Sequence, residues 1–429
     1  MAFSSSPLLR LISPKGIVGS SFNYCNFVKW SGASWFNQRG VGTATTASEA
    51  FRNQDSPPWL MLPPELESGT TNYKFYSLAD NKVETPIPSD VIGNLRLTCR
   101  GSSHGWLALL SQHNDGFFLY NPISRRHIKL PSVLNLPTFP YYNILTPARY
   151  VSKVILSCSP DEDEENCRVV IMRPCGNAPA FCCPGRSKDW TLMLDENRDK
   201  RFYDDCVYSS RQNLFFGLTG NLVLESWDLG DPSSPKLIKY DDVGLYQYVH
   251  ISSLERSSGV MYGRVEHLVL ANEDDLLYLV QKIMPCVGPD GSCFDETDER
   301  CPDNYRYMTI GFDIWKYYPE EQKFKYLDSS SLGGLAIFVG LHNHSVAIQA
   351  SEFPEVKPDS VYFTDGLVAG KLGGDESDDD IEWSGGGGHD IGIYNYKDKT
   401  VSSCYYPCDV RSLKNILPAP IWFFPSRTD

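Results

Sequence analysis

The sequence predicts an all-β protein built as a single β-propeller. Short runs rich in Val, Ile, Leu, Tyr, Phe and Trp alternate with Gly, Pro, Asn and Asp along most of the chain, as strands alternate with turns. No long stretch has the 3.6-residue apolar period of a helix, and 29 prolines would interrupt long helices. A strand–turn–strand unit also recurs, which favours a repeat architecture over several unrelated domains.

The recurring unit occurs five times, in residues 73–84, 117–130, 222–238, 312–326 and 391–402. The spacings between copies are roughly multiples of the 40–50 residues that one four-stranded propeller blade occupies. Each small sheet has two apolar faces and cannot bury both alone, so the sheets are expected to stack in a ring whose ends close on each other. We predict six blades, with seven as the alternative.

Further strands fit between these units. Residues 105–110 read as a strand that opens with Trp106, which we expect to pack in the core between adjacent sheets. Residues 153–172 and 267–282 read as two more hairpins. These assignments place the propeller domain at residues 58–425.

Three polar inserts interrupt the strands, at Asp161–Glu165, Cys286–Asp303 and Gly373–His389. Such acidic or Gly-rich segments bury little apolar surface, and we expect all three to be solvated loops. The last one, the 373–389 insert, contains the acidic run Asp375–Asp380. That run lacks the ligand spacing of a calcium loop, so a solvated charge run is the better interpretation.

Residues 1–50 have the composition of an organellar transit peptide and linker. The first acid is Glu49, whereas Arg10, Lys15, Lys29 and Arg39 precede it in a segment rich in Ser, Thr, Ala and Gly. The apolar run Leu8–Ile12 is too short for a secretory signal and contains an arginine. We predict import into the mitochondrion, with the plastid as the alternative and a disordered tail without a targeting role as the simplest competing interpretation.

Bulk composition excludes several classes of protein. The net charge is −14, and residues 1–50 contribute net positive charge, so the remainder is more acidic still and disfavours nonspecific binding to nucleic acid. No window approaches 18 uninterrupted apolar residues, so no membrane span is expected. The 13 cysteines form no regular framework, and their odd number favours mostly reduced thiols.

Candidate catalytic and metal-binding residues are few. Ser103 and His104 resemble a nucleophile and its base, but neighbouring residues on a strand point to opposite faces. His342 and His344 would share a face of an extended segment and could join His389 and Asp390 in a metal site, but local spacing fixes no third ligand. The sequence around Asn343 fits the tip of a hairpin equally well.

The cysteines offer three further candidates. Cys182 with Cys183, and Cys404 with Cys408, could be zinc or disulfide pairs, but neither belongs to a paired CxxC arrangement. The group Cys286, Cys293 and Cys301 is the best redox or metal candidate among them. Because phosphate-loop, dinucleotide-binding and HExxH motifs are missing, we predict no catalytic residue, no cofactor and no metal, and a protein that is not an enzyme.

An ordered series of motifs links the chain to a known family. Residues 58–63 (PWLMLP), 101–107 (GSSHGWL), 119–122 (LYNP), 350–354 (ASEFP) and 357–365 (KPDSVYFTD) follow one another in this order. The set resembles the plant KIB-type β-propeller family, many of whose members carry an F-box, over roughly residues 58–425. The resemblance implies a propeller that binds protein partners.

The resemblance is incomplete at its N-terminal end. Residues 62–66 (LPPEL) are similar to the opening of an F-box, but Thr70–Tyr73 follows where an amphipathic helix would be required. The chain therefore resembles an organellar branch of the family that lacks the F-box. We expect a protein-interaction propeller, with a small-molecule-binding or enzymatic propeller using the central channel as the alternative. A ubiquitin-ligase substrate receptor is the disfavoured second alternative.

Overall fold

The computed structural model is all-β in the part of the chain that it describes. The described part contains no α-helix, and its short helical turns are η2 (Val133–Asn135) and η5 (Ala350–Glu352). The predicted transit segment at residues 1–50 and the 373–389 insert lie outside it. The described residues are 58–63, 65–67, 70–79, 82–84, 97–111, 116–136, 151–173, 178–194, 203–242, 263–271, 275–287, 293–294, 306–327, 331–365, 390–404 and 419–425.

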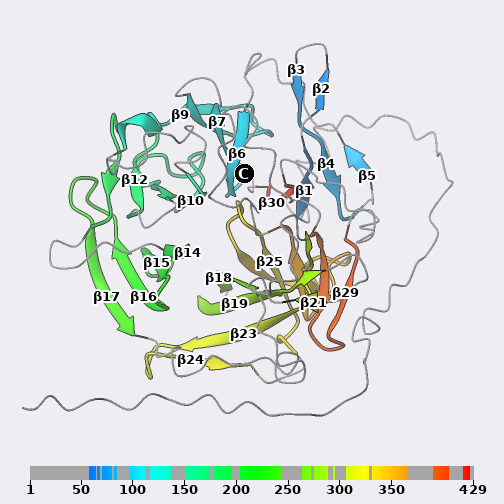
Figure 1. Ribbon diagram of the computed structural model, residues 1–429. Coiled ribbons are helices and arrows are strands. Elements are labelled where there is room, and N and C mark those ends of the chain that lie inside the picture. Colours follow the sequence, from blue (N-terminus) through cyan, green and yellow to red (C-terminus); the bar gives the residue numbers. More distant parts are fainter. Residues whose placement is uncertain are drawn as a thin grey trace, which may run out of the picture.

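Six sheet units are arranged around a common centre and form the predicted propeller (Figure 1). Within each unit the strands are connected mainly as antiparallel neighbours, and the first strand lies nearest the centre. From the centre outward, blade 1 consists of β30 (Ile421–Phe423), β1 (Trp59–Met61), β4 (Phe75–Ser77) and β5 (Lys82–Glu84). Blade 2 consists of β6 (Leu97–Ser103), β7 (Trp106–Ser111), β8 (Phe117–Tyr120) and β9 (His127–Lys129). Blade 3 consists of β10 (Lys153–Leu156), β11 (Val169–Met172), β12 (Ala180–Cys182) and β13 (Thr191–Leu192).

Blades 5 and 6 are joined into one curled sheet of nine strands, because β18 pairs in parallel with β26. Blade 6 also contains a parallel pair, β25 with β27, so its chain path differs from a simple meander. Blade 4 consists of β14 (Tyr203–Ser209), β15 (Leu214–Thr219), β16 (Val223–Asp228) and β17 (Lys236–Asp242). Blade 5 consists of β18 (Gly263–Ala271), β19 (Leu276–Met284), β23 (Gly311–Tyr318) and β24 (Lys323–Tyr326). Blade 6 consists of β26 (Val346–Gln349), β25 (Leu335–Val339), β27 (Ser360–Phe363), β28 (Gly392–Asn395) and β29 (Thr400–Ser402).

The ring is closed by a strand from each end of the propeller. The C-terminal β30 pairs antiparallel with β1, with Leu60 opposite Trp422. Both of these side chains are fully buried, and the ring of Phe423 makes an edge-on contact with Phe75 at 5.3 Å. Blade 1 therefore combines the two ends of the described chain, which removes the open sheet edges that an unclosed ring would present.

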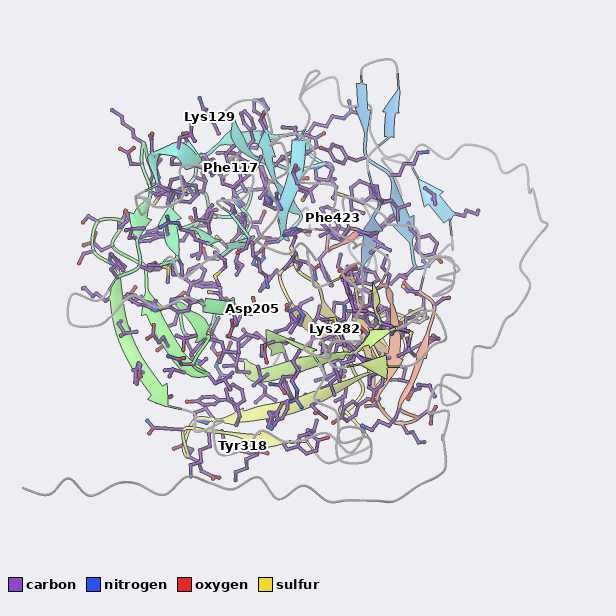
Figure 2. All side chains as sticks on the ribbon, in the orientation of Figure 1. Phe117, Lys129, Asp205, Lys282, Tyr318 and Phe423 are labelled. Atoms are coloured by element: carbon purple, nitrogen blue, oxygen red, sulfur yellow. The ribbon has the colours of Figure 1, made fainter. Side chains whose placement is uncertain are left out.

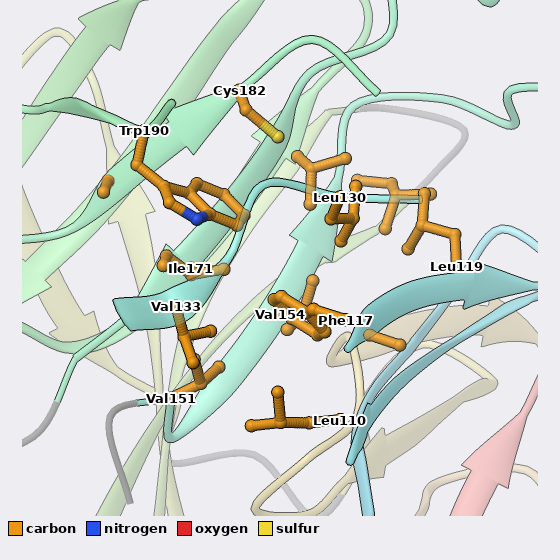
Figure 3. Close-up of a cluster of buried hydrophobic side chains, with 14 of the residues drawn as sticks. Leu110, Phe117, Leu119, Leu130, Val133, Val151, Val154, Ile171, Cys182 and Trp190 are labelled. Carbon is orange, nitrogen blue, oxygen red and sulfur yellow. The ribbon is translucent and has the colours of Figure 1, made fainter. Parts of the chain in front are cut away.

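The apolar core lies between adjacent blades. Figure 3 shows the cluster between blades 2 and 3, where Phe117 and Leu119 face Val154 and Ile171, with Trp190 at one side. Trp106 is fully buried in the same cluster, and its indole N–H donates a hydrogen bond to Ser159 Oγ at 3.1 Å. The expectation that Trp106 packs between adjacent sheets is confirmed.

One local expectation needs correction, and another is confirmed. The Cys286–Asp303 segment is not simply a solvated loop, because it contributes β20 (Cys286–Val287) and β21 (Cys293–Phe294), which pair with β22 (Arg306–Tyr307), and Cys286 is buried. Residues 65–72, where the sequence departs from an F-box, form a hairpin of β2 (Glu65–Glu67) and β3 (Thr70–Asn72) in place of a helix, as expected. Both segments therefore form short antiparallel strand pairs.

Candidate functional site

The innermost strands carry charged side chains that meet between the blades. Asp205 on β14 accepts a hydrogen bond from Lys153 Nζ on β10 at 2.5 Å, and both side chains are buried. Its second oxygen accepts from the Leu268 backbone N–H on β18 at 3.0 Å and lies 3.8 Å from His267 Nδ1. One carboxylate thus connects blades 3, 4 and 5, and Figure 2 places Asp205 near the centre of the ring.

A second buried pair connects blades 5 and 6. Lys282 Nζ on β19 lies 2.8 Å from Asp390 Oδ2 and donates to the Thr364 carbonyl oxygen at 3.1 Å. Asp390 also accepts from the backbone N–H and the hydroxyl of Thr309, at 3.0 and 2.6 Å. Lys282 Nζ also lies over the Phe363 ring, 4.9 Å from the ring centroid. The ammonium group is therefore surrounded by a carboxylate, a carbonyl oxygen and an aromatic ring.

The tip of the β25–β26 hairpin, residues 340–345, reaches across to blades 2 and 3. The backbone of Ser102 pairs with this tip through hydrogen bonds to the His342 oxygen and from the His344 N–H, at 3.1 and 3.0 Å. His342 Nδ1 lies 2.7 Å from the Ser152 carbonyl oxygen, next to β10. Gly340 is required here, since a Cβ would lie 2.1 Å from Thr364 Oγ1.

These contacts bring four histidines into one region. His104 forms the β6–β7 turn together with Gly105, and its ring centroid lies 5.6 Å from that of His344. Burial lowers the pKa of His104 to about 4 and those of His342 and His344 to about 3. Burial also lowers the pKa of His267, against the opposing effect of Asp205. The four imidazoles are therefore neutral at physiological pH.

Buried polar atoms without a hydrogen-bond partner accumulate at this tip. In the described part of the chain they include the Oγ atoms of Ser102 and Ser345, both amide atoms of Asn343, and Nε2 of His104 and His344. Buried polar atoms are nearly always paired, with protein or with ordered water. The tip of residues 340–345 and the β6–β7 turn thus bring several unpaired polar atoms close together in the described interior.

The structure places the predicted catalytic and metal-binding residues in different surroundings. Ser103 Oγ accepts from the Leu156 N–H at 3.3 Å, whereas the His104 ring lies beside His344, so the two residues have different partners. His342 and His344 lie at a hairpin tip, as one of the two interpretations expected, but His389 lies outside the described residues. Within the described ranges, no group of three or more His, Cys, Asp or Glu could hold a metal ion.

The described residues contain only part of the cysteine candidates. Cys182 and Cys183 are free and buried at the end of β12. Cys404 is partly buried, while its suggested partner Cys408 lies outside the described residues. Cys286 is buried, and Cys293 is described only in its backbone. Cys301 and the run Asp375–Asp380 lie outside the described residues.

Sequence reasoning missed the charged residues of the inner strands. Sequence analysis did not single out Lys153, Asp205 or Lys282, although all three lie near His267 in the buried centre of the ring. The available signal was a charged residue next to or within an apolar run, such as Lys153 before Val154–Leu156. Long charged side chains are rarely fully buried unless they are paired, so such positions indicate an internal salt bridge.

The ring of six sheet units and its buried centre define the class of protein as a β-propeller. The model of the KIB1-4 beta-propeller family matches residues 75–395, and the chain belongs to this family. An F-box/kelch-repeat protein of Arabidopsis thaliana is 30% identical over 113 residues, which cover 26% of this chain and 27% of that protein. The chain therefore spans about a quarter of this curated relative.

Solved structures give more distant similarities. YCF48 bound to D1 peptide has a TM-score of 0.31 at 8% identity and covers 66% of this chain and 75% of that chain. TolB from Acinetobacter baumannii has a TM-score of 0.34 at 9% identity, with 80% of this chain and 61% of that one covered. In the described residues, no helix is long and apolar enough to cross a membrane.

Proposed function

We propose that this chain is a non-enzymatic protein-binding β-propeller of a plant organelle. The observation that supports this most directly is on β17, the outer strand of blade 4. Ile238 and Tyr240 alternate along β17 and are 55% and 36% exposed, which makes them two of the few large apolar side chains exposed in the described ranges. Exposed aliphatic and aromatic side chains of this kind act as anchors in protein interfaces.

The buried charges support the same proposal. Lys153, Asp205, Lys282 and Asp390 are paired with each other across blade boundaries. Such pairs specify how the blades meet, and this role requires no substrate. The outer surface is then the part of the ring that is available for recognition.

Binding is tested by comparing two matched surface variants. The tagged full-length chain is cross-linked in isolated plant mitochondria, the attached proteins are identified, and each is purified to measure direct binding. We expect the double variant Ile238→Asp, Tyr240→Ser to weaken binding at least about tenfold, which corresponds to about 1.4 kcal/mol. Val83→Asp, at an exposed position on the outer strand β5, serves as the control. Equal affinity of the double variant and the wild type would contradict binding at β17.

The organelle is part of the proposal. The acid-free, arginine-bearing segment before Glu49 supports import, with the mitochondrion preferred over the plastid. Residues 1–60 fused to a fluorescent protein are expected to direct it to mitochondria. A diffuse cytosolic signal contradicts import, and a plastid signal contradicts the preferred compartment.

A second candidate function is the binding of a small polar molecule at the ring centre. It is favoured by the unpaired buried atoms of Ser102, Asn343 and Ser345 beside the His104–His344 pair. Native mass spectrometry of the protein purified from plant tissue should then show an adduct that His344→Asn removes. If the native and denatured masses agree, the centre holds no such molecule.

A further inference from the structure

We propose that Cys158 and Cys167 form a reversible disulfide bond, which makes the β10–β11 hairpin a site of oxidation by low-molecular-weight disulfides. Cys158 follows β10 by two residues, and Cys167 precedes β11 by two residues. The ladder pairs Leu156 with Val169, and the Ser157 N–H donates to the Arg168 oxygen at 2.9 Å. Continued by one residue, this register places Cys158 directly opposite Cys167.

The position in the ladder favours a bond between the two sulfur atoms. The Ser157 N–H donates to the Arg168 carbonyl oxygen, and the Arg168 N–H donates to Ser157 Oγ at 2.9 Å, so these residues occupy a hydrogen-bonded position of the ladder. The next position is of the non-hydrogen-bonded kind, with Cα atoms about 4.5 Å apart and side chains on one face. A disulfide requires Cα atoms about 4.4–6.8 Å apart. The Cys167 thiol donates to the Cys158 carbonyl oxygen at 3.4 Å, and the Cys158 thiol donates to the Asp163 carbonyl oxygen at 3.6 Å, so both sulfur atoms lie at the base of the same loop.

The environments of the two thiols suit different roles. Cys158 is partly exposed, and its hydrogen bond with Cys167 lowers its pKa, which increases the fraction of reactive thiolate. Cys167 is fully buried, and its hydrogen bond with Cys158 raises its pKa, so it remains a protonated thiol. Cys158 is therefore the attacking residue, and Cys167 is the resolving residue.

The exchange runs in two steps that balance. The Cys158 thiolate attacks one sulfur of oxidised glutathione, the S–S bond breaks, and one glutathione leaves as a thiolate that takes a proton. Cys167 then releases its proton to water and attacks Cys158 Sγ, which expels the second glutathione. The two protein thiols lose two electrons, and one disulfide is reduced to two thiols. The first step removes the negative charge of the Cys158 thiolate, and this charge opposes ionisation of the neighbouring Cys167 thiol.

The bond would close the loop of residues 159–166, which holds blades 2 and 3 together. Within this loop Ser159 accepts from Trp106, while Asp161 binds Asn121 Nδ2 and Arg126 at 2.8 and 3.0 Å. Arg126 also pairs with Glu164. Oxidation at the base of the loop therefore acts on the contacts that connect blade 2 to blade 3.

The test uses a peptide that contains both cysteines and no others. Trypsin cleaves after Lys153 and Arg168 and releases Val154–Arg168. The folded full-length chain is incubated with oxidised glutathione, its free thiols are blocked, and it is digested without reductant. We expect this peptide to carry an internal disulfide that dithiothreitol reverses. Cys167→Ser should instead retain glutathione on Cys158.

Cys182→Ser is the matched control, because Cys182 is buried in the same core cluster as Cys167. This variant is expected to form the internal disulfide as the wild type does. Three results overturn the proposal: both thiols of the wild-type peptide remain free, glutathione stays on Cys158 beside a free Cys167, or Cys167 is found bonded to Cys182.

Discussion

Lys153 Nζ lies 2.5 Å from Asp205 Oδ1, and both side chains are buried where blades 3 and 4 meet. Residues 52 apart in sequence thus form a close charged contact at the centre of the ring. Although burial raises the pKa of Asp205, the charge of Lys153 and the bond with His267 hold it below its usual value. The carboxylate is therefore ionised, and the free energy of the folded state depends on its partners.

Replacing Lys153 with Met should destabilise the protein strongly. The substitution leaves the Asp205 carboxylate buried without its main counter-charge, which typically costs about 3–5 kcal/mol. Urea unfolding followed by tryptophan fluorescence measures the loss. Lys325→Met is the control, because Lys325 pairs with Glu321 at the surface, where ion pairs contribute little. Similar midpoints for the two variants would contradict a structural role for the buried pair.

Gly101 allows blades 2 and 3 to approach closely, so Gly101→Ala should disturb their contact. A Cβ at this position would lie 2.6 Å from the Val154 carbonyl oxygen, and that backbone atom cannot move without shifting β10. Overpacking of this kind costs about 1–3 kcal/mol, measurable as a lower urea midpoint. Gly311→Ala is the matched control, since its nearest neighbour would be the Tyr394 hydroxyl at 3.6 Å, an ordinary contact. Equal urea midpoints for the two alanine variants would contradict a close contact between blades 2 and 3 at Gly101.

The extent to which the fold was predictable differs between the outer and inner strands. All five recurring units correspond to outer strand pairs of blades. These pairs are β4–β5, β8–β9, β16–β17, β23–β24 and β28–β29. Outer strands keep one solvated side, as the exposed–buried–exposed pattern of β9 illustrates, and so retain a readable alternation. The outer pair of blade 3 escaped detection because β13 has only two residues.

The centre of the ring was not predictable in the same way. The contact of His342 with Ser152 joins residues 190 apart, and the parallel pairing of β25 with β27 follows from blade packing and not from any local pattern. His104, His267, His342 and His344 are scattered in sequence, and only the closed ring brings them together. Buried charges such as Lys153 were visible as exceptions in apolar runs, but their partners depend on long-range geometry.

The neutral histidines should make stability fall as the pH decreases. Unfolded histidines titrate near pH 6.5, whereas the pKa is about 4 for His104 and about 3 for His344 in the folded protein. Between these values the unfolded state binds more protons, so the histidine contribution is complete above pH 6.5 and is lost as the pH falls toward 4. Asp204, although it is exposed, acts in the opposite direction, because partial desolvation and the charges of Glu266 and Asp205 raise its pKa.

Comparing variants separates the histidine effect from that of Asp204. Urea midpoints of wild type and His344→Asn are measured between pH 7.5 and pH 4.5. The wild type should lose about 2–3 kcal/mol more than the variant over this range. His127→Asn, at an exposed position on β9, should follow the wild type. Parallel curves for wild type and His344→Asn would contradict a buried neutral imidazole at position 344.

Trp106 connects blade 2 to the loop of residues 159–166, so Trp106→Ala should be among the most damaging single substitutions. The side chain is fully buried among the residues of blades 2 and 3, and truncating such a tryptophan costs about 3–5 kcal/mol. Ser159→Ala removes only the hydrogen bond to the indole N–H and should cost about 1 kcal/mol. Leu134→Ala, at a position that is 59% exposed, provides the surface control. Urea unfolding should therefore rank the midpoints with Leu134→Ala highest, Ser159→Ala next and Trp106→Ala lowest. If Trp106→Ala unfolds at the same midpoint as Leu134→Ala, the tryptophan does not hold the two blades together, and partner binding becomes the property to measure for that variant.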